Sequence, residues 1–365
     1  MKRVGKMDFE TGEYILLSPQ AEKVQENFLY NDHYFSCVFQ TGNGYSTYVH
    51  PSGIYNQIIE GTPYYGHLHF YAHNRVVYVR DDASGEFWSV GWYPVCAPRE
   101  SYECRHGAGY SIFRNRTDGI DASWRIFVPR GEDPVELWTL QFANRSRRVR
   151  RLSVFSVAEL SLKTEFPLYG HEIYMRGLHL PGGNGVGTRK IAMNLPHPYF
   201  GAVLLSSRKP VSWDTDKAAF LGGEFESPAK PAAVRRGRCS GSLSSRALVL
   251  GALHHRLTVR PGQTARLDLL AGACKVDRIP AEAARYRRKY LAGNGAAADR
   301  AFAAMRKDVE KRLARMQMQT PDRKFNYVFN RWVPRLIELG ATLGRWGFFG
   351  FRDLVQQNQG ALTLG

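Results

Sequence analysis

The chain has 365 residues, of which 44% are hydrophobic and 13% aromatic, a composition typical of a globular protein that buries a sizeable core. There is no run of about 18 apolar residues, and the basic N-terminus leads into Asp8, Glu10 and Glu13 without an apolar stretch, which excludes a transmembrane helix and a signal peptide. The net charge of +17 suits a polyanion-binding protein, but no RNA-binding aromatic signature or helix-turn-helix pattern accompanies the basic clusters. We expect a cytoplasmic protein without a membrane segment, and nucleic acid is the weaker alternative for a partner.

Residues 14–274 are a succession of short β patterns that are interrupted by Gly, Pro, Asn and Asp. In residues 78–92, the alternating Tyr78-Val79-Arg80 precedes turn chemistry at residues 81–85 (DDASG), and residues 87–92 (FWSVGW) begin another strand. Many short strands with closely spaced turn signals favour an antiparallel β-sandwich.

Two basic clusters interrupt the pattern. Residues 145–151 (RSRRVRR) lie between two strand patterns, which predicts a solvated hairpin turn. Residues 285–289 (RYRRK) lie in a helical stretch with apolar residues on its other face. A solvated basic surface accounts for both clusters, and a positive field would also suit an enzyme of phosphate and sugar phosphates.

The sequence gives no metal or disulfide pattern. The five cysteines are scattered and contain no C-x-x-C pair, so we expect free thiols and neither a zinc site nor a disulfide framework. His67 and His69 would share one face of a strand, but that strand is so aromatic that a packed, hydrogen-bonded segment is the better interpretation. We expect no metal and no organic cofactor.

The character of the chain changes at Pro280. Residues 281–290 are helical in composition, and residues 296–318 carry an amphipathic stripe at spacings of three and four, formed by Phe302, Met305, Val309, Leu313 and Met316. A third helix is predicted to begin with Thr320 as N-cap and Pro321 in the first helical position. Pro334 should kink this helix because it lacks a backbone donor and crowds the preceding turn.

Several motifs resemble glycoside hydrolase family 94, the family of cellobiose and chitobiose phosphorylases. They occur in the family's order from about residue 10 to residue 360: GYS at 44–46, RDD with FWS and W-Y-P-V at 80–95, YECRHGAGYS at 102–111, DTD at 214–216, FLG at 220–222 and GFRD at 350–353. The resemblance implies a mainly β fold, with a large antiparallel supersandwich at residues 1–278, a helical linker at 279–319, and the truncated first part of an (α/α)₆ catalytic barrel at 320–365.

The same resemblance implies the activity. Members of the family cleave a β-glycoside with inorganic phosphate as co-substrate, giving an α-sugar 1-phosphate and a free sugar, and the resemblance implies a homodimer for the full-length form. The family's general acid is the Asp of a Trp-Asn-Asp segment, which does not occur in these 365 residues. We therefore expect no catalytic residue in this chain, the general acid beyond Gly365, and an N-terminal portion that is inactive by itself.

The resemblance also implies residues that bind substrate. Asp353, next to Arg352, matches the Asp that hydrogen-bonds donor-sugar hydroxyls. The alternative is that Asp353 pairs with Arg352 or caps the next helix. The family's Arg lies six residues before that Asp, where this chain has Gly347. Arg345 fills the role only if the loop contains a two-residue insertion.

On the acceptor side, Arg176 in Tyr174-Met175-Arg176 matches an aromatic–Gln–Arg segment of the N-terminal domain, and a surface arginine is the alternative. Two other functions remain open. One is a non-catalytic carbohydrate-binding β-sandwich, and the other is a polyanion-binding basic protein.

Overall fold

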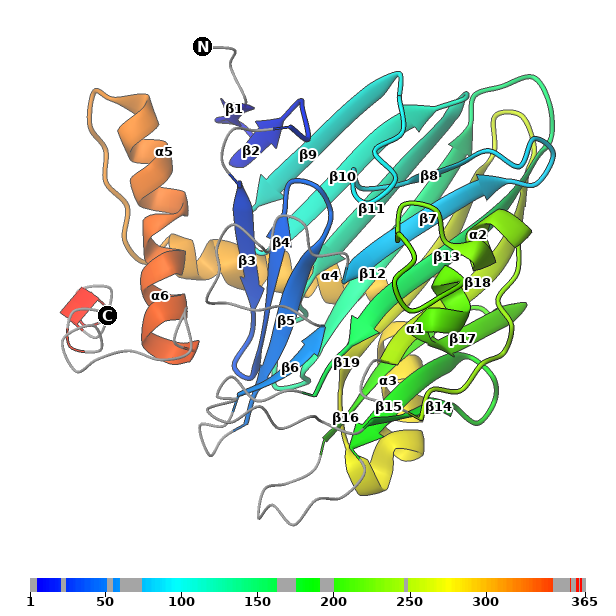
Figure 1. The fold of residues 1–365 in the computed structure, drawn as a ribbon. Coiled ribbons are helices and arrows are strands. Elements are labelled where there is room, and N and C mark those ends of the chain that lie inside the picture. Colours follow the sequence, from blue (N-terminus) through cyan, green and yellow to red (C-terminus); the bar gives the residue numbers. More distant parts are fainter. Residues whose placement is uncertain are drawn as a thin grey trace.

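The computed structural model describes residues 5–20, 24–50, 55–59, 74–162, 175–190, 200–245 and 249–343, together with residues 355, 359, 360 and 362. In this part of the chain, two large antiparallel sheets face each other and helices lie on their outer faces (Figure 1). The predicted mainly β supersandwich, followed by a helical region, is confirmed.

The first sheet has ten strands in the described residues, in the order β1-β2-β9-β10-β11-β12-β19-β16-β15-β14. Their bounds are β1 (Gly5–Asp8), β2 (Glu13–Leu16), β9 (Ser101–Gly107), β10 (Tyr110–Thr117), β11 (Ile120–Phe127), β12 (Val135–Asn144), β14 (Met175–His179), β15 (Gly185–Lys190), β16 (Phe200–Ser206) and β19 (Thr264–Lys275).

The second sheet has nine strands among the described residues, seven of them in the order β17-β18-β13-β6-β5-β4-β3, while β7 pairs with β13 and with β8. Their bounds are β3 (Glu26–Tyr30), β4 (Tyr34–Phe39), β5 (Gly44–Val49), β6 (Tyr55–Ile59), β7 (Arg75–Asp81), β8 (Phe87–Ser89), β13 (Arg150–Leu160), β17 (Ser212–Asp216) and β18 (Val249–Val259).

The main core lies between the sheets. Along β11 buried and partly exposed residues alternate, as expected when one face of a strand points into a sandwich. Trp124 of β11 and Trp138 of β12 meet at 5.4 Å between ring centroids, and Val154 of β13 belongs to the same buried cluster. Alternating large apolar side chains from both sheets therefore stabilise the two-layer arrangement.

The structure confirms one predicted turn and corrects another. β7 and β8 pair antiparallel, as predicted for residues 78–92. The hairpin predicted around residues 145–151 is wrong, because β12 and β13 on either side belong to different sheets. Arg150 in this segment is 1% exposed and its guanidinium pairs with Asp81 and Asp118. The chain between β12 and β13 therefore passes from one sheet to the other at the edge of the sandwich. Asp81 and Asp118 bind the buried Arg150 there.

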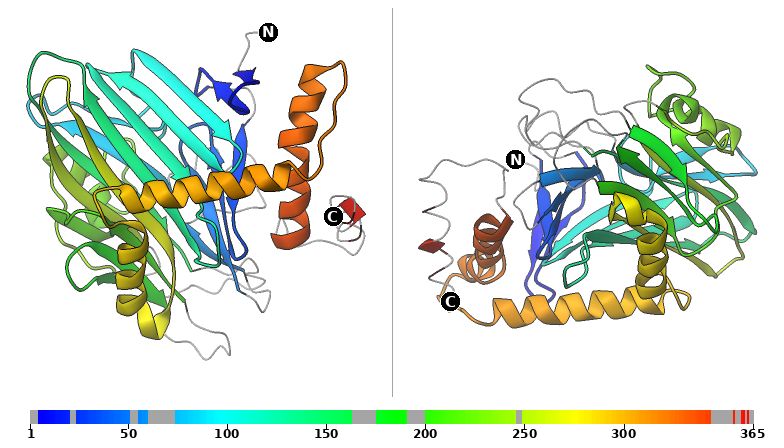
Figure 2. Two further views of the ribbon diagram at one scale, coloured as in Figure 1. Left: turned by 180° about the vertical axis from the view of Figure 1, so that it is seen from behind. Right: turned by 90° about the horizontal axis from the view of Figure 1, so that it is seen from below.

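The helices are α1 (Lys217–Leu221), α2 (Ala232–Arg236), α3 (Ile279–Tyr290), α4 (Ala296–Leu313), α5 (Arg323–Arg331) and α6 (Val333–Leu343), with a 3₁₀ turn η2 (Val276–Arg278) before α3. α1 and α2 pack on the outer face of the nine-stranded sheet, where Phe220 and Val234 meet Phe155. α3 and α4 lie on the outer face of the ten-stranded sheet, and Figure 2 shows α4 running across it.

The predicted amphipathic stripe of α4 is confirmed. Met305, Val309 and Leu313 are buried in a cluster with residues of β10, β11, β12, β16 and β19, and Phe302 packs against that cluster. The helix ends at Leu313, so Met316 lies beyond it. The stripe serves packing between α4 and the ten-stranded sheet.

The start of α5 differs from the prediction. Asp322 is the N-cap, and its carboxylate accepts from the backbone N–H groups of Lys324 and Phe325. Thr320 instead donates from its backbone N–H and its hydroxyl to Asn326 Oδ1, and its backbone oxygen accepts from Asn326 Nδ2. These hydrogen bonds attach the segment before the helix to the first turns of α5. The expected interruption at Pro334 is present, because α5 ends at Arg331 and α6 starts at Val333.

Candidate functional site

Three of the four predicted site residues, Arg345, Arg352 and Asp353, lie outside the described residues, so their roles in holding a sugar stay predictions. The last described helix of more than two residues, α6, ends at Leu343, two residues before Arg345. The contacts that fix α6 therefore determine where the chain enters this region.

α6 is held against the sandwich by Tyr30 of β3. The single proton of the Tyr30 hydroxyl is shared between two acceptors, the backbone oxygen of Arg335 at 3.0 Å and Glu338 Oε2 at 2.9 Å. The Arg335 guanidinium lies 4.8 Å from the Tyr30 ring centroid, and its Nη2 donates to the backbone oxygen of Phe28 at 2.8 Å. Leu339, 1% exposed, joins a hydrophobic cluster of β3, β4 and β5. Burial raises the pKa of Tyr30, so its hydroxyl stays protonated and keeps donating to α6.

α5 is fixed to the N-terminal hairpin and to α4. The rings of Tyr327 and Phe9 meet edge to face at 5.7 Å, and Arg331 Nη1 donates to both carboxylate oxygens of Glu310 at 2.7 Å. Figure 1 shows α5 and α6 beside β1, β2 and β3. This helical pair therefore docks on one flank of the sandwich through specific contacts.

Arg176, the fourth predicted residue, lies on β14, the edge strand of the ten-stranded sheet. It is exposed and opposite Arg189 of β15, and its backbone oxygen accepts from the Thr188 hydroxyl at 3.2 Å. β14 and α6 lie at opposite sides of the molecule in Figure 1. Within one chain the structure does not bring Arg176 beside the end of α6, and its predicted role at the acceptor sugar stays a prediction.

The motif at 102–111 carries polar residues that the sequence could not assign, and they support the fold. The Glu103 carboxylate accepts from Arg105 and Arg114. His106 is buried, and its Nδ1 lies 2.9 Å from the hydroxyl of Ser111. Burial lowers the pKa of His106 to about 4, so the imidazole is neutral at neutral pH. The geometry is that of a hydrogen-bonded strand pair.

The DTD motif at 214–216 is also structural. Asp214 is buried, and its carboxylate accepts from the backbone N–H and the hydroxyl of both Ser240 and Ser242. Asp216 caps α1 by accepting from the backbone N–H of Ala219. These carboxylates fix the loop after α2 and the start of α1.

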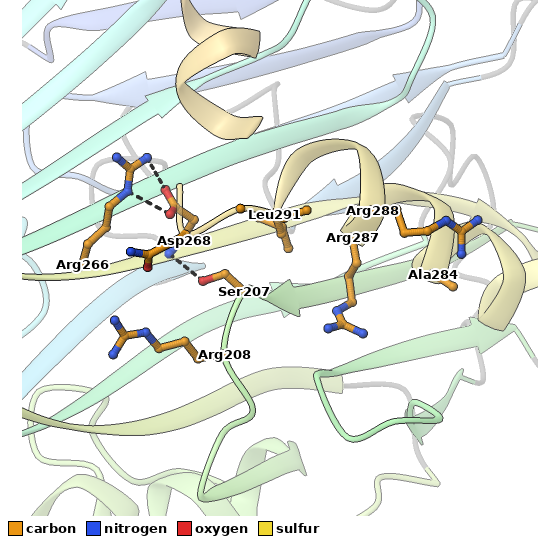
Figure 3. A pocket seen from close by; sticks show the side chains of 11 residues that line it. Ser207, Arg208, Arg266, Asp268, Ala284, Arg287, Arg288 and Leu291 are labelled. Carbon is orange, nitrogen blue, oxygen red and sulfur yellow. Dashed lines mark hydrogen bonds and ion pairs between the residues drawn. The ribbon is translucent and has the colours of Figure 1, made fainter. Parts of the chain in front are cut away.

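A pocket of about 450 Å³ lies where α3 and the following turn approach the ten-stranded sheet (Figure 3). Four arginines and one aspartate are among its lining residues: Arg208, Arg266, Arg287, Arg288 and Asp268. The sequence pattern assigns the basic run of residues 285–289 to a solvated surface. It gives no sign that the segment after β16 and the strand β19 bring Arg208 and Arg266 opposite that run.

Both carboxylate oxygens of Asp268 in this pocket accept hydrogen bonds from protein groups. Its carboxylate accepts from Arg266 Nε and Nη2, each at 2.9 Å, and from the hydroxyl of Thr139 at 2.9 Å. Arg266 also pairs with Asp299 of α4 at 2.6 Å. Burial opposes the charge of Arg266, but the hydrogen bonds to Asp299 and Asp268 raise the pKa of its guanidinium.

The described residues contain no group of three or more His, Cys, Asp or Glu side chains that could hold a metal ion. None of the helices in the described ranges is long and apolar enough to cross a bilayer.

Two antiparallel sheets packed face to face, with helices along both outer faces, define a β-supersandwich protein. The profile of the family described as "Glycosyl hydrolase 94, supersandwich domain" matches residues 12–291. The chain therefore belongs to glycosyl hydrolase family 94, in agreement with the resemblance of its motifs.

Three relatives illustrate the similarity. The chain is 32% identical over 358 residues to the solabiose phosphorylase of Paenibacillus borealis, covering 98% of this chain and 45% of that protein. It is 29% identical to the N,N'-diacetylchitobiose phosphorylase of Vibrio proteolyticus, with coverages of 97% and 44%. It is 27% identical to the 3-O-beta-D-glucopyranosyl-beta-D-glucuronide phosphorylase of Paenibacillus borealis, with coverages of 91% and 41%. The chain spans less than half the length of these relatives.

Proposed function

We propose that the chain is the N-terminal part of an inverting disaccharide phosphorylase that acts on a β-glycoside. The observation that carries the proposal is the alignment of 98% of the chain with less than half of a solabiose phosphorylase. In this proposal residues 1–278 are the supersandwich, 279–319 the linker and 320–365 the start of an (α/α)₆ catalytic barrel.

The reaction needs an acid on one side of the glycosidic bond and phosphate on the other. The acid protonates the leaving oxygen as the C1–O bond breaks, and a phosphate oxygen attacks C1 from the opposite face, which inverts a β-glycoside to an α-sugar 1-phosphate. Phosphate replaces the water and general base of a hydrolase. We propose that polypeptide beyond Gly365 supplies the acid, because no Trp-Asn-Asp occurs in the chain.

This chain would contribute to binding the sugars. Asp353 would accept hydrogen bonds from two neighbouring hydroxyls of the donor sugar, with Arg352 and Arg345 close to the sugar and phosphate. Arg176 would contact the acceptor. Since β14 lies far from α6 in Figure 1, we propose that Arg176 reaches the acceptor across a homodimer.

The exposed side of α5 and α6 supports a continuation of the barrel. Phe325, Val328 and Leu336 are 47%, 40% and 39% exposed although they lie on helices with apolar stripes. Later helices of an (α/α)₆ barrel would cover such side chains.

The test restores the missing portion. The region encoded directly after residue 365 is sequenced, and the joined polypeptide is incubated with phosphate and three substrates: solabiose, N,N'-diacetylchitobiose and 3-O-β-D-glucopyranosyl-β-D-glucuronide. We expect a Trp-Asn-Asp segment downstream and phosphate-dependent release of an α-sugar 1-phosphate from at least one disaccharide. Release of free sugars that does not depend on phosphate would identify a hydrolase instead.

A second candidate function is a non-catalytic carbohydrate-binding β-sandwich. The observation that favours it is the lack of a Trp-Asn-Asp segment within the 365 residues. Calorimetric titration of the chain with the same disaccharides separates the two candidates. Saturable binding together with a stop codon directly after residue 365 favours the binding module.

A further inference from the structure

Three arginines of the basic pocket have no carboxylate partner among the described residues. Arg208 follows β16, while Arg287 and Arg288 lie in the last turn of α3. No ion pair joins any of them to an acidic side chain in the described ranges, in contrast to Arg266, which pairs with Asp268 and Asp299. The pocket therefore presents net positive charge that the described carboxylates do not neutralise.

Arg287 is partly buried and oriented by a neutral group. The neutral group is the side-chain amide of Asn184. Its nitrogen donates to the backbone oxygen of Gly182 at 2.9 Å, and in this orientation its oxygen accepts from Arg287 Nη2 at 3.2 Å. Arg287 Nε is buried and has no hydrogen-bond partner. A buried guanidinium donor without an acceptor costs free energy, and a rotation of the Arg287 side chain toward an oxyanion in the pocket would remove that cost. In Figure 3 the side chains of Arg208 and Arg287 extend on either side of Ser207.

Ser207 adds a neutral donor between these arginines. Its backbone N–H donates to the backbone oxygen of Asp268 at 2.9 Å, and its Oγ accepts from the backbone N–H of Asp268 at 3.2 Å. Because the hydroxyl oxygen already accepts a hydrogen bond, its own proton points elsewhere, and no described group accepts it. Asp268 is held by Arg266 and Thr139, so it does not compete for Arg208 or Arg287.

The size of the pocket and its donors indicate the class of ligand. About 450 Å³ is within the range of small-molecule sites, roughly 300–1,000 Å³, and it exceeds what a bare phosphate ion fills. Arginine recognises phosphate oxygens through two parallel N–H donors, and two arginines with a hydroxyl suit a dianion. We propose that this pocket binds the phosphate group of a small phosphate monoester, held by Arg208, Arg287 and Ser207. The pocket lies between α3 and the ten-stranded sheet, and none of its lining residues belongs to α6.

The position of the pocket gives such binding a structural consequence. Its walls come from the sheet on one side and from α3 and the α3–α4 turn on the other. A bound monoester would join the linker to the supersandwich and so slow the separation of α3 from the sheet.

The experiment uses the whole 365-residue chain. Binding of α-D-glucose 1-phosphate, inorganic phosphate, sulfate and glucose is measured by calorimetry at constant ionic strength, for the wild type and for Arg287→Gln, Arg208→Gln and Ser207→Ala. Arg151→Gln is the matched control, because it removes the same charge at an exposed position of β13 in the other sheet. We expect saturable binding of glucose 1-phosphate, weakened roughly tenfold or more by each arginine substitution and unchanged in the control.

The anion series distinguishes the sources of the phosphate group. Tighter binding of glucose 1-phosphate than of inorganic phosphate and sulfate supports the monoester, whereas binding of glucose 1-phosphate that is no tighter than that of either inorganic anion overturns it in favour of a general anion site. Basic side chains in the last turn of a helix also stabilise its negative end. If Arg287→Gln lowers the melting temperature while no anion binds to the wild type, that helix-capping role is the correct one and the proposal fails.

A second measurement needs no variant. Phenylglyoxal modifies accessible arginines, so peptide mapping after modification of the wild type reports protection directly. Glucose 1-phosphate should protect Arg208 and Arg287 and leave Arg151 equally reactive. Equal modification of all three arginines with and without the ligand would overturn the proposal even if a variant failed to fold.

Discussion

Arg75 and Glu136 form an ion pair that is completely buried between the two sheets. Arg75 lies on β7 and Glu136 on β12, and Nη2 and Nε of the guanidinium approach Oε2 and Oε1 at 2.9 and 3.0 Å. Both side chains are 0% exposed. Ser36 and Trp138 extend the network, because Arg75 Nη2 donates to the serine hydroxyl and Trp138 Nε1 donates to Glu136. The pair therefore joins the layers of the sandwich by directional bonds in an apolar core.

Glu136→Gln should strongly destabilise the fold. The substitution keeps the volume of the side chain but leaves the Arg75 charge buried without a counter-ion, which costs about 3–5 kcal/mol. Urea unfolding measures the change. Asp32→Asn is the control, because Asp32 and Arg130 form an exposed pair at 3.4 Å whose loss should cost less than about 1 kcal/mol. Equal effects of the two substitutions would show that the buried pair has no special role.

Buried histidines should make stability fall as the pH is lowered. Desolvation lowers the pKa of His254 to about 3, and the ring stacks on Phe155 between the hydroxyls of Ser212 and Ser153. In the unfolded chain the pKa is about 6.5. Between these two pKa values the unfolded state binds a proton at His254 and the folded state does not. The contribution of His254 to the free energy of unfolding is therefore complete above about pH 6.5 and is lost progressively toward about pH 3.

His254→Gln removes that titration and should flatten the pH dependence. Between pH 7 and pH 5 the wild type should lose roughly 2 kcal/mol through this residue alone. His106 and His255, whose pKa values burial lowers to about 4, add to the same trend. Urea unfolding at the two pH values measures the slope. An identical slope in the variant and the wild type would contradict the assignment, whatever the absolute loss of stability.

Asp133→Asn should loosen the docking of α3. The Asp133 carboxylate accepts from Arg285 Nη1 at 2.7 Å, Lys289 Nζ at 2.6 Å and the Tyr290 hydroxyl at 2.7 Å, so one side chain holds the last turns of α3. Removing its charge should cost roughly 1.5–3 kcal/mol. Limited proteolysis should then cut the turn at residues 291–295 faster. The neighbouring exposed Glu132→Gln is the control, and equal cutting of both variants would show that apolar packing alone docks the helix.

Local sequence chemistry was enough to predict the β-sandwich, the hairpin of β7 and β8, and the buried stripe of α4. These features depend on periodicity and turn residues within a few positions of each other. The resemblance of short motifs supplied the family.

The features that the sequence did not predict depend on side-chain contacts that form only in the folded protein. Arg150 lies in a basic run that suggests solvent, and only the crossing from β12 to β13 places it beside Asp81 and Asp118. Thr320 and Asp322 are both good N-caps, and the choice depends on Asn326, which engages Thr320. The basic pocket is assembled from the segment after β16, from β19, and from α3 and the turn after it, which are adjacent only in the folded protein.

The 365-residue chain by itself should show no phosphorolysis of cellobiose or N,N'-diacetylchitobiose. A general acid contributes on the order of 10²–10⁴-fold to the rate, and the chain has no Trp-Asn-Asp segment to provide it. Release of sugar 1-phosphate is measured against a buffer control and against a related phosphorylase. Turnover by the chain alone would show that its acid lies elsewhere and that the motif alignment is wrong.

Asp353→Asn tests the sugar site in a polypeptide that carries the whole barrel. The substitution keeps the volume of the side chain, turns one acceptor oxygen into a donor and removes the charge. Hydrogen bonds to a charged group contribute roughly 1.5–3 kcal/mol, so kcat/KM should fall about ten- to a hundredfold while the melting temperature stays unchanged. Asp277→Asn, at an exposed position after β19, is the matched control and should alter neither quantity. In the synthetic direction Arg176→Ala should mainly raise the KM of the acceptor. If Asp353→Asn instead lowers the melting temperature and leaves catalysis intact, the carboxylate pairs with Arg352 or caps a helix, because a sugar ligand would affect turnover before it affected folding.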